Sequence, residues 1–191
     1  MDSKKKILFL GYTSNKTKLI RFLKKKNKIK EFGQRNLTLK IVKSYDLIIS
    51  FGYRKIISKK ILASLPRPPI NLHMSYLPFN RGAHPNFWSF IENTPKGISI
   101  HEINHKIDGG KIIVRKKIKI SLDNKITFKK SYMILKKEIE DLFLKNYDLI
   151  LNKKYKLKKY KSTGSFHLKK NLPNNLKSWN EKILSYLKKL N

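Results

Sequence analysis

Three polar side chains in the middle of the chain could act together on one reacting atom. Asn71 and His73 stand two positions apart in a short apolar segment, so as strand residues they would project from the same face of a sheet. A neutral carboxamide can donate an N–H to a developing oxyanion. An imidazole transfers protons near neutral pH because its unperturbed pKa is about 6.5. This pair therefore suits acyl transfer.

A carboxylate from a separate stretch could complete this site. Asp108 follows the predicted strand 98–103 and precedes Gly109 and Gly110, which permit a tight backbone close to a ligand. Within reach of His73, it would orient the imidazole tautomer, stabilise its cation or hold a water that relays a proton. Each residue alone has a structural explanation, in a turn or in the core. We expect the set to form the active site.

The segments that must position these residues are typical of an α/β protein. Continuous apolar runs at 6–10 and 46–51, each closed by a glycine, predict strands buried on both faces of a parallel sheet. Segments 70–73, 98–103 and 111–120 predict three more strands. The candidate catalytic residues then lie at strand ends, which is where open α/β sheets carry their sites.

Helical spacing of apolar residues predicts the elements that cover this sheet. Short helices are expected around 19–23, 39–42, 56–65 and 85–91. Thr127 is a plausible N-cap for a long amphipathic helix that begins at Phe128. After a basic connection and a turn at 164–167, a final helix is expected. Its apolar residues are Trp179, Ile183, Tyr186 and Leu187.

Together these elements predict a Rossmann-like, mostly parallel sheet flanked by helices. Residues 27–38 are polar and suggest no element, so the N-terminal half looks abbreviated. No Gly/Ser-rich or Pro-rich linker divides the 191 residues. We expect a catalytic domain over residues 1–151 and a short, basic, helical C-terminal extension over 152–191.

The charge of the chain is extreme. It carries 45 Lys and Arg against 12 Asp and Glu, for a net charge of +33. Such a charge binds polyanions nonspecifically at low salt. Nucleic-acid readers depend on arginine for base contacts, however, and most of these cations are lysines spread from end to end. An AT-rich coding sequence explains the lysines more simply than an evolved nucleic-acid surface does.

Composition also limits the cellular compartment we expect and the kinds of site the chain can form. The absence of cysteine excludes disulfides, thiolate metal sites and cysteine nucleophiles. The longest apolar runs are too short to span a bilayer. No cluster of histidines and carboxylates has metal-ligand spacing, so we expect no metal. We expect a cytoplasmic protein without membrane insertion.

The order and spacing of the polar motifs resemble a known enzyme family. Asn71-x-His73-x-Ser75-x-Leu77-Pro78 is followed by Arg81-Gly82, His101 and Asp108-Gly109-Gly110. This series resembles the catalytic core of the folate-dependent formyltransferases, which include enzymes that formylate glycinamide ribonucleotide, methionyl-tRNA and amino sugars on nucleotides. Residues 46–58 resemble the folate-binding loop of the family, and residues 164–167 resemble a turn of its sugar-modifying branch.

The resemblance implies transfer of a formyl group from N10-formyltetrahydrofolate to a primary amine. Asn71 would hydrogen-bond the formyl oxygen, His73 would stabilise the same charge and assist proton movement, and Asp108 would complete the proton relay. The residues implied to hold the folate donor are Arg54, Lys55, Ile56, Ile57, Asn104, Ile107 and Asp108. The residues expected to bind the acceptor are Gly11, Thr13, Ser14, Asn15, Arg81, Gly82 and His84; the first four form a turn that could cradle a phosphate.

Several acceptors fit the resemblance. An amino sugar on a nucleotide suits the short C-terminal segment best. Methionyl-tRNA suits the charge, but residues 152–191 leave no room for the additional domain of that branch, and glycinamide ribonucleotide suits the sequence around Arg81 less well. A hypothesis of another class is a basic nucleic-acid-binding module that has lost catalysis.

Two further side chains have two explanations each. Trp88 is a helix core residue or stacks on a substrate, and His101 supports the site or is a core histidine. The apolar face around Trp179 and Leu187 could serve a homodimer contact.

Overall fold

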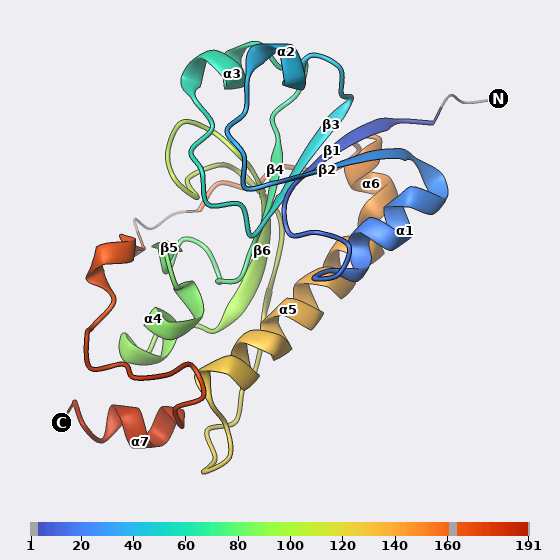
Figure 1. Ribbon diagram of the computed structural model, residues 1–191. Helices are drawn as coiled ribbons and strands as arrows, with labels where there is room; N and C mark the ends of the chain where they lie inside the picture. The colour runs from blue at the N-terminus through green and yellow to red at the C-terminus, as the bar shows by residue number, and fades with distance from the viewer. Residues whose placement is uncertain (1–3, 161–163, 191) are drawn as a thin grey trace.

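The computed structural model describes residues 4–160 and 164–190, which form a six-stranded mixed sheet flanked by helices (Figure 1). The strand order is β2-β1-β3-β4-β6-β7. The first four of these strands run parallel, and β6 runs antiparallel to both of its neighbours. The strands are β1 (Lys6–Gly11), β2 (Lys28–Gly33), β3 (Leu47–Phe51), β4 (Ile70–His73), β6 (Gly97–Glu102) and β7 (Ile112–Lys117). The predicted α/β class is confirmed.

Helices cover both faces of the sheet, which explains the continuous apolar runs. In β1, Ile7 and Phe9 pack under α1 (Lys18–Lys26), α5 (Phe128–Lys145) and α6 (Tyr147–Leu151). Leu8 and Leu10 point to the other face and pack with α2 (Leu39–Val42) and α3 (Lys59–Ala63). Figure 1 shows the two groups of helices on opposite sides of the strands. Alternate side chains of one strand therefore enter two separate cores.

Capping side chains begin several helices, and Thr127 is the cap that the sequence predicts. The Thr127 hydroxyl accepts the backbone N–H of Lys130 at 3.1 Å and begins α5, as expected. Thr17 caps α1 and also donates to the Glu140 carboxylate at 2.7 Å, so the same side chain ties α1 to α5. These bonds satisfy N–H groups that a helix N-terminus leaves free.

The segment that the sequence left unassigned contains a strand. β2 lies at the sheet edge beside β1, and Phe32 is its one buried hydrophobic residue. An edge strand with one half-solvated face carries little apolar signal, which explains why residues 27–38 suggested no element. The connection between β2 and β3 is short, because its one helix, α2, has four residues.

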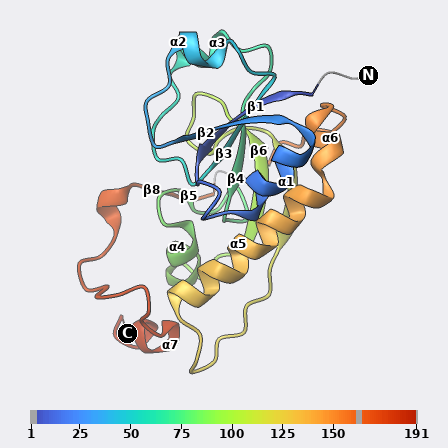
Figure 2. The same cartoon turned by 45° about the vertical axis from the view of Figure 1, so that its right-hand side comes forward.

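The C-terminal extension packs along the rest of the molecule. β8 (Phe166–His167) pairs in parallel with β5 (Arg81–Gly82), so the predicted turn at 164–167 ends in a strand (Figure 2). The chain then passes through a short 3-10 helix, Lys169–Asn171, to α7 (Ile183–Leu187). The boundary at residue 151 stays a prediction, although it coincides with the end of α6.

The final helix is shorter than expected, and Trp179 lies before it. The carbonyls of Trp179 and Glu181 accept the backbone N–H groups of Lys129 and Phe128, at the start of α5. Because these carbonyls bond to α5, residues 179–182 do not form a helical turn. A third core lies here, between α4 (Pro85–Ile91), the start of α5 and α7, and contains Phe87, Phe90, Phe128, Ile183 and Tyr186.

Candidate active site

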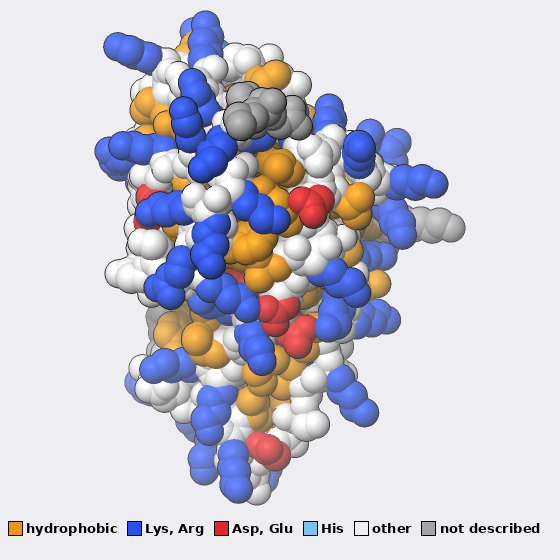
Figure 3. Space-filling view, turned by 90° about the vertical axis from the view of Figure 1, so that its right-hand side faces the viewer, with side chains coloured by type: hydrophobic (Ala, Val, Ile, Leu, Met, Phe, Trp, Pro, Cys, Tyr) orange, Lys and Arg blue, Asp and Glu red, His pale blue; other side chains and the backbone are white. Residues whose placement is uncertain are grey.

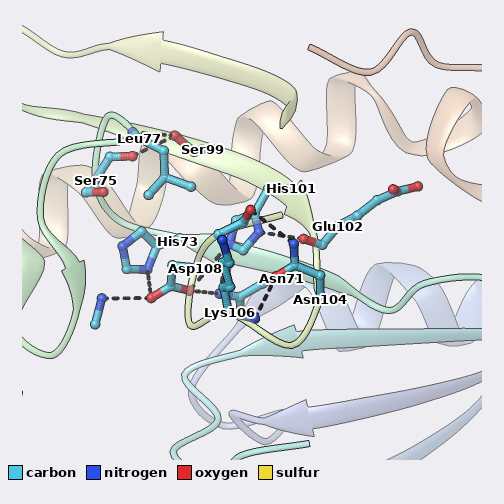
Figure 4. Close-up of polar contacts among 12 residues, drawn as sticks. Asn71, His73, Ser75, Leu77, Ser99, His101, Glu102, Asn104, Lys106 and Asp108 are labelled. Carbon is cyan, nitrogen blue, oxygen red and sulfur yellow. Dashed lines mark hydrogen bonds and ion pairs between the residues drawn. The ribbon is translucent and has the colours of Figure 1, made fainter. Parts of the chain in front are cut away.

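Asn71, His73 and Asp108 meet at the carboxyl end of β4 (Figure 4). The Asn71 side-chain amide donates to Asp108 Oδ1 at 3.0 Å. His73 Nδ1 lies 3.7 Å from Asp108 Oδ2. Both β4 side chains thus contact one carboxylate, as their spacing of two residues predicts. The three residues are brought together as the sequence analysis expected.

The loop between β6 and β7 carries Asp108 to the end of β4. Asp108 has a left-handed backbone, with φ of 45°. A Cβ on Gly110 would lie 1.6 Å from the Glu102 carbonyl oxygen, so only glycine fits there. The Asn104 side chain donates to the Gly109 carbonyl at 3.1 Å and braces the loop. The close approach of Gly110 to the Glu102 backbone therefore fixes the loop that positions the Asp108 carboxylate.

His101 supports the site and is also buried. It lies directly opposite Asn71 across the β4–β6 ladder and is 1% exposed. Its Nδ1 donates to the Glu102 carbonyl at 2.8 Å, so Nε2 presents a lone pair. That nitrogen accepts from the Asn71 amide at 3.3 Å and lies 3.4 Å from Asp108. Both hydrogens of the Asn71 amide therefore face acceptors within the site.

His73 is held at its other nitrogen by the backbone. Its Nε2 donates to the carbonyl oxygen of Asn80 at 3.2 Å. Since a carbonyl can only accept, the neutral imidazole carries its hydrogen on Nε2. Its Nδ1 lone pair then points toward Asp108. Asn80 is a residue that the sequence analysis missed, because a backbone acceptor has no side-chain signature.

The electrostatics of the site favour an anionic carboxylate and a neutral imidazole. Burial lowers the pKa of His73, and the charge of Asp108 offsets this only in part. Burial opposes ionisation of Asp108 as well. The pKa of Asp108 is nevertheless held below its ordinary value, because a proton on His73 or His101 favours the anion, as does the hydrogen bond from the Gly82 N–H. The site thus holds a base that can accept a proton near neutral pH.

Of the expected acceptor residues Arg81, Gly82 and His84, Gly82 contacts the site directly. Its N–H donates to Asp108 Oδ2 at 2.9 Å. Arg81 Nε is buried without a hydrogen-bond partner among residues 4–160 and 164–190. His84 begins α4 and stacks on Trp179, with ring centroids 5.3 Å apart. Burial lowers the pKa of His84, and the nearby charges of Arg54 and Lys169 lower it further.

One N–H group of the expected phosphate turn is already bound to a carboxylate. The Ser14 N–H donates to the carboxylate of Glu31 at 2.8 Å, and the Thr13 hydroxyl donates to Asn15. A Cβ on Gly11 would lie 2.2 Å from the Phe51 carbonyl oxygen, so this glycine permits the close approach of β1 and β3. An anion at Ser14 would have to displace Glu31.

The loop expected to hold the folate donor offers unpaired backbone groups. Ile56 is 80% exposed and Ile57 is buried in the core under α3. Within the described part of the chain, the backbone N–H and C=O groups of Lys55, Ile56 and Ile57 make no hydrogen bond, and neither do the N–H groups of Ile107 and Asp108. A surface hollow of about 470 Å³ lies beside these two loops and is lined by Lys59, Leu62, Ala63, Pro68, Ile103, Asn104 and His105.

Trp88 packs within the protein. Its ring stacks on His167 of β8, with centroids 4.0 Å apart and planes 9° apart, and meets Phe87 edge-on. His167 Nε2 in turn lies 2.9 Å from the Glu92 carboxylate. The core explanation for Trp88 is therefore the one that the structure favours.

The part of the chain that the structure describes lacks two kinds of feature. It contains no group of three or more histidine and carboxylate side chains arranged to hold a metal ion. None of its helices combines the length and apolar character needed to cross a membrane.

Comparison with known proteins identifies the family. A family model described as formyl transferase matches residues 13–131, which is more than half of the chain. The dTDP-4-amino-4,6-dideoxyglucose formyltransferase of Mycobacterium tuberculosis is 30% identical over 131 residues, covering 68% of this chain. The bifunctional polymyxin resistance protein ArnA of Wigglesworthia glossinidia brevipalpis is 37% identical over 51% of this chain. The chain spans about half the length of the mycobacterial relative, at 54%.

A solved structure matches nearly end to end. The formyltransferase PseJ from Anoxybacillus kamchatkensis, in complex with UDP-4,6-dideoxy-4-formamido-L-AltNAc and tetrahydrofolate, is 35% identical with a TM-score of 0.84. The match covers 94% of this chain and 96% of PseJ. The motif series around Asn71, His73 and Asp108 lies within residues 13–131, which match the family model. The chain belongs to the formyl transferase family.

Proposed function

We propose that the chain transfers a formyl group from N10-formyltetrahydrofolate to the amine of an amino sugar carried on a nucleotide. The observation that carries this proposal is the convergence of Asn71, His73 and Asp108 on one point at the end of β4. A carboxamide donor, a neutral imidazole and an anionic carboxylate are what acyl transfer to an amine needs. The family membership and the formamido sugar bound by PseJ support the same reaction.

The two loops beside the site fit the donor. When bound, N10-formyltetrahydrofolate supplies an electrophilic formyl carbon on N10. A pterin ring presents donors and acceptors along one edge, and the unpaired backbone groups of residues 55–57 and 107–108 offer complementary ones. Asn104 and the hollow that it helps to line extend this surface. The tetrahydrofolate in PseJ is a further support.

Each of the three site residues then has a role in formyl transfer. As the acceptor nitrogen adds to the formyl carbon, its oxygen gains charge and accepts an Asn71 amide hydrogen, replacing the longer 3.3 Å contact to His101. His73 Nδ1 takes the proton that the amine loses, and the new imidazolium faces Asp108. The bond from the formyl carbon to N10 breaks, and the proton passes to N10. The C–N bond formed replaces the C–N bond broken, so the step needs no oxidant or reductant.

The acceptor and the compartment belong to the same proposal. An amino sugar on a nucleotide is favoured because PseJ and the mycobacterial relative both act in amino-sugar formylation by name. A cytoplasmic location is proposed on composition, since a chain without cysteine needs no oxidising compartment. A homodimer contact around Trp179 and Leu187 stays a prediction.

A screen of acceptors tests this function. The purified chain is incubated with N10-formyltetrahydrofolate and a panel of UDP- and dTDP-linked amino sugars, glycinamide ribonucleotide and methionyl-tRNA, and mass spectrometry records a formyl gain. We expect a gain on at least one amino-sugar nucleotide that is lost in Asn71→Ala and kept in the matched control Asn175→Ala. Formylation of methionyl-tRNA or glycinamide ribonucleotide alone would reassign the acceptor. No turnover, with RNA bound selectively at physiological salt, would favour the binding module.

A further inference from the structure

Asn80 connects the candidate catalytic histidine to the rest of the chain. It has a left-handed backbone, with φ of 54°, and its side chain is completely buried. Its carbonyl accepts His73 Nε2 at 3.2 Å, which places the imidazole hydrogen on Nε2 and the lone pair on Nδ1. The position of this one carbonyl therefore decides which nitrogen faces Asp108.

Every polar group of Asn80 is held by a neighbour. Ser165 Oγ accepts the backbone N–H at 2.9 Å and lies 3.4 Å from the side-chain Nδ2. The amide also donates to the Glu92 carboxylate at 3.1 Å, and its oxygen accepts the Thr94 hydroxyl at 2.7 Å. Ser165 is the partner that acts on the Asn80 backbone directly, one peptide unit from the carbonyl that His73 uses.

Ser165 belongs to the C-terminal extension, outside the residues 13–131 that match the family model. The extension is anchored on both sides of the contact, because the Ser165 carbonyl accepts the Arg81 N–H at 3.0 Å and the His167 carbonyl accepts the Ala83 N–H at 2.8 Å. Gly82, within the same segment, donates its N–H to Asp108. Residues 80–82 thus supply one backbone partner to His73 and one to Asp108, and β8 holds this segment from outside.

We propose that Ser165 is a positioning residue that acts through Asn80 to keep His73 in its Nε2–H form. Without the hydroxyl, the buried Asn80 N–H loses its acceptor, so the backbone of residue 80 shifts and its carbonyl no longer lines up with the imidazole. Rotation of the ring then turns Nδ1 away from the acceptor nitrogen, or a change of tautomer places the hydrogen on Nδ1 and removes the lone pair that would accept the proton. The kinetic part of this inference rests on the proposed function; the tautomer does not.

Ser165→Ala, Ser165→Thr and the matched control Ser178→Ala test the inference. Ser178 lies in the same extension, and its hydroxyl accepts the Asn180 N–H at 3.1 Å. Nitrogen-15 NMR of histidine-labelled protein, assigned with His73→Ala, reports the tautomer of His73 in each variant. We expect Nε2–H in the wild type, Ser165→Thr and Ser178→Ala, and a mixture of tautomers in Ser165→Ala. With an acceptor found by the screen, kcat of Ser165→Ala should fall about 10- to 100-fold with little change in KM.

The outcomes separate this inference from the proposed function. A wild-type His73 in the Nδ1–H form overturns the inference even if Ser165→Ala fails to fold. Wild-type tautomer and kcat in a folded Ser165→Ala overturn it as well. A tautomer change in Ser165→Ala without formyl transfer by the wild type supports the positioning role and contradicts the proposed function.

Discussion

Asp108 is the residue on which the other site contacts converge. Its two oxygens accept from the Asn71 amide and the Gly82 N–H, and His73 and His101 both face it. Replacing it with asparagine keeps the shape and removes the charge. One acceptor oxygen becomes an NH2 group, which would face the N–H donors of Asn71 or Gly82. The carboxylate therefore organises the site as well as taking part in it.

We expect Asp108→Asn to lower kcat on the order of 10²- to 10³-fold, because the imidazolium that forms on His73 loses its counter-charge. The measurement is steady-state formyl transfer with the acceptor identified by mass spectrometry. Asp141→Asn is the control, since Asp141 is an exposed carboxylate paired with Lys18. A change of only a few fold in Asp108→Asn would remove the carboxylate from the mechanism.

The pH dependence of kcat/KM follows from the environment of His73. Because burial lowers its pKa from 6.5, the neutral base forms at lower pH than in a free imidazole. As pH rises, kcat/KM should increase with a midpoint below 6.5 and then level, while Asp108 stays ionised throughout. The titratable groups that face His73 are Asp108 and His101. A midpoint above 6.5 that belongs to the free enzyme would contradict a neutral His73.

Sequence alone predicts the side chains of this site better than its backbone. Asn71, His73 and Asp108 are visible because strand periodicity and glycine neighbours place them. The acceptors and donors supplied by Asn80 and Gly82 are peptide groups, which any residue type carries. Likewise, the occupation of the Ser14 N–H by Glu31 depends on pairing between β1 and β2 that no local pattern reveals.

The loop that carries Asp108 depends on one glycine. Gly110→Ala would place a methyl group against the Glu102 carbonyl, so the backbone must move and take Asp108 with it. We expect a loss of stability of about 1–3 kcal/mol together with loss of formyl transfer. Gly33→Ala is the comparison variant: its methyl group finds no atom within 4 Å, but its φ of 65° strains an alanine, so it should lose stability and keep formyl transfer. Denaturant unfolding and the transfer assay check both; an active Gly110→Ala would show that the loop tolerates the shift.

The N-cap of the longest helix makes a separate prediction. Thr127→Ala removes the acceptor of the Lys130 N–H and should reduce the free energy of unfolding by about 1 kcal/mol. Thr127→Ser keeps the oxygen and should cost less. Neither change touches the site, so kcat should stay near the wild-type value. A loss of kcat in both variants would indicate that α5 transmits its position to β4.

Helices and strands with a clear pattern of apolar residues could be predicted from the sequence. Those that depend on pairing with segments far away in the sequence could not. The strands at 46–51 and 70–73 and the helix after Thr127 follow from apolar patterns that the structure buries on the expected faces. β8 has two residues and exists because β5 pairs with it. The late start of α7 likewise follows from hydrogen bonds between residues 179–181 and the start of α5.

The charge of the whole molecule has a simple physical consequence. Figure 3 shows lysine and arginine side chains scattered over the face that carries α1 and α6, with few acidic side chains between them. Scattered cations bind phosphates without reading bases. We expect two unrelated DNA duplexes to bind equally, with affinity falling on the order of 10³-fold between about 50 and about 200 mM salt. Fluorescence anisotropy measures this; a sequence preference that survives at high salt would support an evolved nucleic-acid surface.

The third core covers part of the apolar face that the sequence suggested for a homodimer contact. Ile183 and Tyr186 are buried against α4 and α5, whereas Trp179 is 40% exposed. Most of the apolar face that could have served a homodimer is thus covered within one chain. Sedimentation of the wild type against Trp179→Ala tests what remains of that prediction.

The pairing of β8 with β5 also sets the order in which the protein can mature during translation. Asn80 and Ser165 are 85 residues apart, and nearly all of the large sheet has left the ribosome before Ser165 is synthesised. A nascent chain can therefore bury its main cores while the carbonyl that faces His73 is still unsecured. We expect the site to become competent only after Ser165 has left the ribosome.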